Sequence, residues 1–139
     1  CTKLTDVSLN GCQVTSGAIT ELATKCEMLK YLSLAECSYV RDSALVSLGK
    51  YQPNLEFLNV SNCTGLTVTG ITKLIRKNYQ HANTSLTHID ISWCTNASDA
   101  ISVFKHCTDL EYLNVEYTQV TDSVLLGLVK ECKNLKYLH

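Results

Sequence analysis

Aliphatic residues recur along the chain in one spacing, three residues and then two, as at Leu110, Leu113 and Val115. The first leucines of the six copies are Leu4, Leu29, Leu55, Leu86, Leu110 and Leu135, and the last copy stops at the end of the chain. These leucines lie 25, 26, 31, 24 and 25 residues apart. A pattern with such a period predicts a solenoid, in which each copy is one structural unit stacked on the next.

Each copy contains two predicted elements. The alternation at Leu113, Asn114 and Val115 predicts a short strand with one apolar face. In the second half, apolar residues recur at intervals of three or four and predict a helix, at Ile19/Leu22, Leu45/Leu48, Ile71/Leu74/Ile75, Ile101/Phe104 and Leu125/Leu128/Val129. Candidate N-caps precede these helices, most clearly at Thr121 and less clearly at Thr15, Asp42 and Ser98.

The alternation of strand and helix predicts an α/β fold for residues 1–139, a single solenoid fragment of about five repeats. Crossovers between parallel strands are right-handed. Helices need nearly twice the lateral spacing of strands, so we expect the parallel sheet on the concave face and the helices on the convex face. The third repeat is longer than the others at residues 76–85. This insertion is either a longer helix with a harmless surface loop or a loop at a binding face.

The composition is that of a folded chain, because 45% of the 139 residues are hydrophobic and 18% are charged. A formal net charge of −1 gives no electrostatic reason to expect nucleic acid or an anionic membrane as a partner. No run of 18 apolar residues and no signal-peptide pattern is visible. The chain begins at Cys1, ends inside a strand pattern and lacks recognisable capping repeats, so we expect a window from a longer protein.

The eight cysteines follow the repeat. Four lie three residues after the last apolar strand position (Cys12, Cys37, Cys63 and Cys94), and three lie three residues before the next leading leucine (Cys26, Cys107 and Cys132). A buried cysteine is a small hydrophobe whose thiol donates weakly to a backbone carbonyl. Reduced structural thiols favour a cytoplasmic or nuclear location. Four Asn-x-Ser/Thr sequons, at Asn59, Asn62, Asn83 and Asn96, would instead suggest secretion, and we give the cysteines more weight.

The repeat can be written L-x-x-L-x-L-x-x-C-x-x-[V/L]-T-D-x-[A/G]-[I/L]-x-x-L-x-x-x-C. Repeat five fits nearly throughout, with Thr118 for the first cysteine. Repeat two has Tyr51 in place of the closing cysteine, repeat three lacks that cysteine, and repeat four has Ala97-Ser98-Asp99 for V-T-D. This pattern resembles the cysteine-containing leucine-rich repeats of F-box/LRR proteins. The resemblance covers essentially the whole chain.

In that family the repeats hold substrates for a cullin-type ubiquitin ligase, and a separate N-terminal F-box docks to the ligase core. The resemblance therefore implies a non-catalytic protein-interaction module, the substrate-recognition repeats of a ubiquitin ligase adaptor. No segment of the sequence looks like an F-box, so a ligase core would be reached through a segment outside it. Similar repeats also occur in scaffolds, among them subunits of the ciliary dynein regulatory complex and a mitotic-exit antagonist. A structural subunit of a large assembly, with a ciliary location, stays open as the alternative.

Strand residues that alternate with the core leucines are expected on the concave face. An aromatic row beside small polar residues suits recognition of a protein partner, with Trp93 and Tyr117 at one rim. The same rings could instead only shield the sheet and pair across strands. The predicted protein-binding residues are Tyr31, Phe57, His88, Asp90, Trp93, Tyr112, Glu116 and Tyr117.

Neither a metal site nor a catalytic site is predicted. The cysteines after the strands would form a linear ladder without any C-x-x-C pair, whereas zinc needs four ligands that converge on one point. His88 and Asp90 share a strand face, with Ser92 as the one candidate nucleophile nearby. The sequence has no G-x-S-x-G and no phosphate-binding glycine loop. We therefore expect no cofactor and no enzymatic activity.

Overall fold

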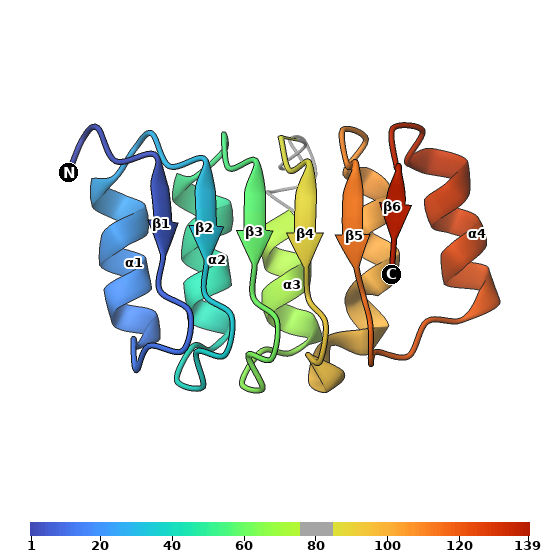
Figure 1. Ribbon diagram of the computed structural model, residues 1–139, viewed down its shortest axis with the longest axis horizontal. Coiled ribbons are helices and arrows are strands. Elements are labelled where there is room, and N and C mark those ends of the chain that lie inside the picture. Colours follow the sequence, from blue (N-terminus) through green and yellow to red (C-terminus); the bar gives the residue numbers. More distant parts are fainter. Residues whose placement is uncertain (76–84) are drawn as a thin grey trace.

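The computed structural model describes residues 1–75 and 85–139, so the predicted insertion at 76–85 lies outside the described residues except for Ser85. Six strands form one sheet whose order follows the chain: β1 (Asp6–Ser8), β2 (Tyr31–Ser33), β3 (Phe57–Asn59), β4 (His88–Asp90), β5 (Tyr112–Asn114) and β6 (Tyr137–Leu138). The helices are α1 (Ser16–Lys25), α2 (Asp42–Tyr51), α3 (Val68–Ile75), η1 (Thr95–His106) and α4 (Asp122–Glu131). Figure 1 shows the strands side by side, with the helices covering one face of the sheet.

The strands are parallel and keep one register throughout. The middle residues pair in a single row, which runs through Val7, Leu32, Leu58, Ile89, Leu113 and Leu138. Because successive strand residues point to opposite faces, this row faces the helices and its neighbours in the sequence face away. The interior leading leucines (Leu29, Leu55, Leu86 and Leu110) are fully buried. The predicted strand–helix repeat and parallel sheet are confirmed.

A ladder of thiols links neighbouring repeats through the core. The Sγ atoms of Cys37, Cys63 and Cys94 donate to carbonyl oxygens one repeat earlier, those of Leu9 (3.0 Å), Leu34 (3.0 Å) and Val60 (3.1 Å). All eight cysteines are free, and only Cys1 and Cys12 are exposed. Burial raises the pKa of Cys63 to about 12, so this thiol stays protonated and keeps its donor.

The position that cysteine fills at the end of other repeats, three residues before the next leading leucine, is occupied in repeat two by Gln52 and not by Tyr51 as the sequence pattern suggested. Gln52 ends α2, is 1% exposed, and donates from Nε2 to the carbonyl oxygens of Ala23 (2.7 Å) and Cys26 (2.8 Å). Cys132 makes the equivalent link at the end of α4, where its Sγ lies 3.4 Å from the carbonyl oxygen of Phe104. A side-chain amide therefore replaces a thiol as the donor between repeats.

Repeat four forms a 3-10 helix, Thr95–His106, where the sequence predicted an ordinary helix. Its buried residues lie at intervals of three, in the rows Ala97/Ala100/Val103 and Ser98/Ile101/Phe104. This spacing suits three residues per turn better than 3.6, and the pair Ile101/Phe104 alone did not distinguish the two. The predicted cap Ser98 lies inside this helix. Its hydroxyl donates to the carbonyl oxygen of Thr95 and accepts from the backbone N–H of Gln119 in the next repeat.

Of the four predicted caps, Thr15 is confirmed, whereas Thr121, Asp42 and Ser98 do not cap their helices, and Asp42 and Ser98 bond to the next repeat instead. Thr121, the clearest candidate, makes no side-chain cap bond, whereas Thr15 accepts from the N–H of Ala18 at 3.4 Å. The carboxylate of Asp42 accepts from the backbone N–H (2.8 Å) and the hydroxyl (2.6 Å) of Thr67, the residue before α3. A Cβ at Gly70 would collide with this carboxylate, which explains glycine in the first turn of α3.

The apolar residues of α4 are only partly buried. Leu128 is fully buried, whereas Leu125 is 39% and Val129 is 58% exposed. The helix α4 packs against η1, and no other described helix covers it. The predicted apolar stripe is therefore present, but only one of its three residues lies in the core.

Candidate protein-binding surface

The face of the sheet that the helices leave uncovered, here called the sheet face, carries a row of rings from the first residues of β2 to β6. Consecutive ring centroids are 4.1 Å apart for Tyr31 and Phe57, 6.0 Å for Phe57 and His88, and 5.8 Å for His88 and Tyr112, with near-parallel planes. Tyr137 extends the row at a centroid distance of 6.3 Å with a tilted plane. The shared register brings these rings together, since each occupies the same repeat position. Four predicted residues therefore form one continuous surface.

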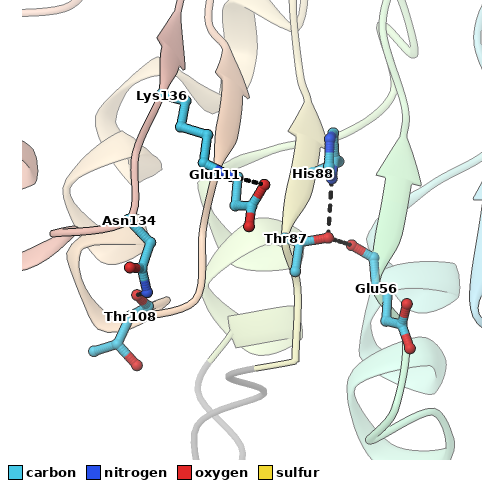
Figure 2. A network of polar contacts seen from close by, with 7 residues as sticks. All are labelled: Glu56, Thr87, His88, Thr108, Glu111, Asn134 and Lys136. Atoms are coloured by element: carbon cyan, nitrogen blue, oxygen red, sulfur yellow. Dashed lines mark hydrogen bonds and ion pairs between the residues drawn. The ribbon is translucent and has the colours of Figure 1, made fainter.

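Polar contacts at the starts of the strands orient the middle of this row. The hydroxyl of Thr87 donates to the carbonyl oxygen of Glu56 (3.1 Å) and lies 2.9 Å from Nδ1 of His88. Figure 2 shows these contacts and the ion pair of Lys136 with Glu111, which has an N–O distance of 2.9 Å. Lys30 forms an ion pair with Glu56 at the same distance. Lys30 and Lys136, which precede β2 and β6, are therefore each paired with a glutamate that precedes the neighbouring strand.

A shallow hollow of about 260 Å³ lies next to the row and is lined by Phe57, Asn59, His88, Ile89, Asp90 and Tyr112. Asp90 is the charged group in this hollow, and three donors hold its carboxylate. Oδ1 accepts from the N–H (2.9 Å) and hydroxyl (2.7 Å) of Ser92, and Oδ2 accepts from Nδ2 of Asn114 (3.2 Å). Asn114 was not among the predicted residues. Its signal in the sequence was its repeat position, which is that of Asp90 one strand earlier.

Trp93 and Tyr117 stack at the rim where the strands end. Their ring centroids are 3.6 Å apart with an angle of 20° between the planes. Trp93 is 48% and Tyr117 is 65% exposed, so the stack does not belong to the core. Glu116 is exposed beside Tyr117, and its carbonyl oxygen accepts from the N–H of Trp93 at 3.0 Å. Three of the predicted protein-binding residues, Trp93, Glu116 and Tyr117, therefore lie together at this rim.

The backbone at this rim has a demanding conformation. The residue three positions after the last residue of each of the first five strands has a positive φ, at Gly11 (68°), Glu36 (63°), Asn62 (54°), Trp93 (62°) and Tyr117 (56°). Glycine and asparagine adopt this left-handed region readily, but bulky residues do so at a cost on the order of 1–3 kcal/mol. Two aromatic residues therefore occupy positions where the backbone alone favours smaller ones.

The arrangement of His88, Asp90 and Ser92 does not form a nucleophile–base pair. Ser92 is 6% exposed and donates its hydroxyl to Asp90, while Nδ1 of His88 is engaged by Thr87. A nucleophilic serine needs its hydroxyl bonded to a base that a third group orients, and no described contact joins His88 to Ser92. Within residues 1–75 and 85–139, no three His, Cys, Asp or Glu side chains converge as a metal site would require. In the same residues, no helix combines the length and apolar character needed to cross a membrane.

Comparison with known sequences agrees with this architecture. A model of the leucine-rich repeat matches residues 82–95. A curated relative, the F-box protein SKIP1 of Arabidopsis thaliana, is 25% identical over 126 residues, which cover 90% of this chain and 38% of the relative. The chain thus spans well under half the length of that protein. The predicted resemblance to the leucine-rich repeats of F-box/LRR proteins is confirmed.

Solved structures of similar shape point to the same fold. The tropomodulin C-terminal domain of Caenorhabditis elegans superposes with a TM-score of 0.70 at 18% identity, over 96% of this chain and 84% of that domain. The yeast Rad7 and Elc1 complex contains a chain that matches with a TM-score of 0.68 at 21% identity, over 84% of this chain and 29% of its own length. The fold class is therefore that of an α/β leucine-rich-repeat solenoid, as predicted.

Proposed function

We propose that the chain is a non-catalytic protein-interaction module and that it serves as the substrate-recognition repeats of an F-box-type ubiquitin ligase adaptor. The observation that carries this proposal is the exposed Trp93–Tyr117 stack beside the row of rings on the sheet face. Large rigid rings around a hydrogen-bonding centre are the usual anchors of protein interfaces, and exposed apolar clusters tend to mark contacts. The similarity to a protein named as an F-box protein supports the finer part of the proposal.

In this proposal the partner protein lies on the concave side, against the strands, and the ligase core is contacted by a segment outside the 139 residues. The repeats act in the cytoplasm or the nucleus. All eight cysteines are free and six are buried, and the thiols of Cys37, Cys63 and Cys94 donate to backbone carbonyls, which suits a reducing compartment.

The test is affinity capture of the full-length protein from its own cells, followed by mass spectrometry. We expect subunits of a ubiquitin ligase core in stoichiometric amounts, together with substrates that disappear in Trp93→Ala and Tyr117→Ala variants. Leu126→Ala is the matched control, because Leu126 is an exposed apolar residue on α4, on the helix side of the sheet.

Structural proteins captured without any ligase core would overturn the adaptor role. That result would favour the alternative of a scaffold subunit in a large assembly, of which the ciliary dynein regulatory complex is the example. A scaffold buries its helices as well as its sheet, so Leu126→Ala would then disturb assembly as much as Trp93→Ala.

A further inference from the structure

We infer that the sheet face recognises an arginine-bearing segment of its protein partner, with the Trp93–Tyr117 stack and the carboxylates of Asp90 and Glu116 as the anchor. The inference rests on the proposed function as a protein-interaction module and adds the chemistry of the partner.

The first argument is the sign of the charge on this surface. The outward-facing strand and rim positions of the repeats contain four carboxylates, at Asp6, Glu36, Asp90 and Glu116, and neither lysine nor arginine. The two histidines of these positions are His88 and His139. The lysines at the starts of the strands, Lys30 and Lys136, are each paired with a glutamate. The whole chain has a net charge of only −1, so negative charge is concentrated here. Such a face attracts cationic side chains and repels carboxylates and phosphates.

The second argument is the geometry of Asp90. Its carboxylate is held by Ser92 and Asn114, so it has a defined direction before any partner arrives. An ionised carboxylate has about four acceptor positions, and the described donors use three of them. Oδ2 retains capacity for one further donor from a partner. Because Asp90 lines the hollow, a side chain that enters the hollow comes next to this carboxylate.

The third argument is the exposed area of the rim rings. Stacking covers one face of Trp93 and one face of Tyr117, and both residues nevertheless remain about half exposed or more. A guanidinium group packs flat against the open face of a tryptophan or tyrosine and still donates to a neighbouring carboxylate, which an ammonium group does less well. Glu116, next to Tyr117, supplies that carboxylate at the rim. Arginine therefore fits this surface better than lysine.

Trp93 is the single tryptophan of the chain, so its fluorescence reports on this site directly. The probe is a nonapeptide in which arginine alternates with glycine and serine, titrated into the protein at low salt. The matched peptides replace arginine by citrulline, which keeps the shape without the charge, and by lysine. We expect a saturable change in Trp93 emission with the arginine peptide below about 1 mM, at least fivefold weaker binding of the lysine peptide and no saturation with citrulline.

The variants Glu116→Gln and Asp90→Asn are expected to weaken binding of the arginine peptide at least fivefold. Glu116 is exposed and makes no described side-chain bond, so Glu116→Gln keeps the fold even if Asp90→Asn disturbs Ser92 and Asn114. Glu21→Gln on α1 is the control for net charge, because this residue is exposed on the helix side.

Equal responses to arginine and citrulline, no response to arginine, or equal losses in Glu21→Gln and Glu116→Gln would each overturn the inference. These outcomes leave the proposed function standing if affinity capture still yields a partner that Trp93→Ala releases. Failure of the proposed function appears separately, as a capture experiment in which substitutions on the sheet face release nothing.

Discussion

The side-chain amide of Gln52 donates to the carbonyl oxygen of Ala23 at 2.7 Å and so joins the end of α2 to the end of α1. In the last described helix a thiol, that of Cys132, makes the same link to Phe104. Two of the described repeats therefore place a buried donor at this position, and cysteine is only one way to supply it. Core stability in this fold depends on such links as well as on leucines, because an unsatisfied buried carbonyl is costly.

Replacing Gln52 tests this requirement. Gln52→Leu removes the donor for the carbonyls of Ala23 and Cys26 and is expected to lower the free energy of unfolding by about 1–3 kcal/mol. Gln52→Cys restores one donor and should lose distinctly less. Urea unfolding followed by circular dichroism measures both. If the two variants were equally stable, the donor would not matter and the position would only need volume.

Two helical glycines are expected to respond in opposite directions to alanine. A Cβ at Gly49 would lie 2.8 Å from the carbonyl oxygen of Lys73 and 2.9 Å from that of Leu74, so α2 and α3 would have to separate. Gly49→Ala should therefore destabilise the protein by about 1–3 kcal/mol. At Gly127 on α4 a Cβ meets nothing within 4 Å, and Gly127→Ala should stabilise by about 0.5–1 kcal/mol through helix propensity. Thermal and urea unfolding compare the pair, and a gain for Gly49→Ala would contradict the close approach.

The buried thiols make the protein sensitive to alkali. Burial raises the pKa of Cys63 to about 12 and that of Cys94 to about 11, from an ordinary 9.0. Below about pH 9 the thiols of Cys63 and Cys94 are protonated in the folded and in the unfolded protein. Above this pH the unfolded chain loses these protons first, because its cysteines keep the ordinary pKa. The free energy of unfolding should therefore fall as the pH rises from about 9 towards 12. Urea unfolding measured across this range should give a shallower fall for Cys63→Ala than for the parent chain.

Alkylation provides a second readout of the thiols. Iodoacetamide reacts with the thiolate, so at pH 8 the exposed Cys12 should be modified first and the buried Cys63 should stay unmodified until the protein unfolds. Peptide mass spectrometry gives the extent at each cysteine. Rapid modification of Cys63 in the native protein would show that the thiol ladder opens easily.

Trp93→Asn separates binding from stability. Asn62 occupies the same rim position with a φ of 54°, close to the 62° of Trp93, and asparagine adopts this region with less strain. We expect the free energy of unfolding to stay constant or to rise by about 1 kcal/mol, while partner capture is lost. The measurements are urea unfolding and affinity capture on the same preparation. Unfolding of this variant would mean that the indole supports the core and is not a contact residue.

The strands and their core residues could be predicted from the sequence because their signal is local. The spacing of Leu110, Leu113 and Val115 recurs in each copy and predicts one short strand there. The structure places the equivalent residues of the interior copies in the core. The row of rings could be predicted from the same spacing, because a constant register places equivalent residues of neighbouring strands side by side. The helix of repeat four could not be assigned in this way, because apolar residues three apart fit both a 3-10 and an ordinary helix.

Periodicity along the chain was thus sufficient for the solenoid, the parallel sheet and the row of rings. The side-chain hydrogen bonds between repeats could not be read from it, because they join atoms some 21 to 29 residues apart whose distance depends on how the units stack. The amide of Gln52 on Ala23, the carboxylate of Asp42 on Thr67 and the hydroxyl of Ser98 on the N–H of Gln119 are of this kind. The left-handed backbone beneath Trp93 and Tyr117 belongs with them, since the sheet imposes it on whichever residue stands at the rim.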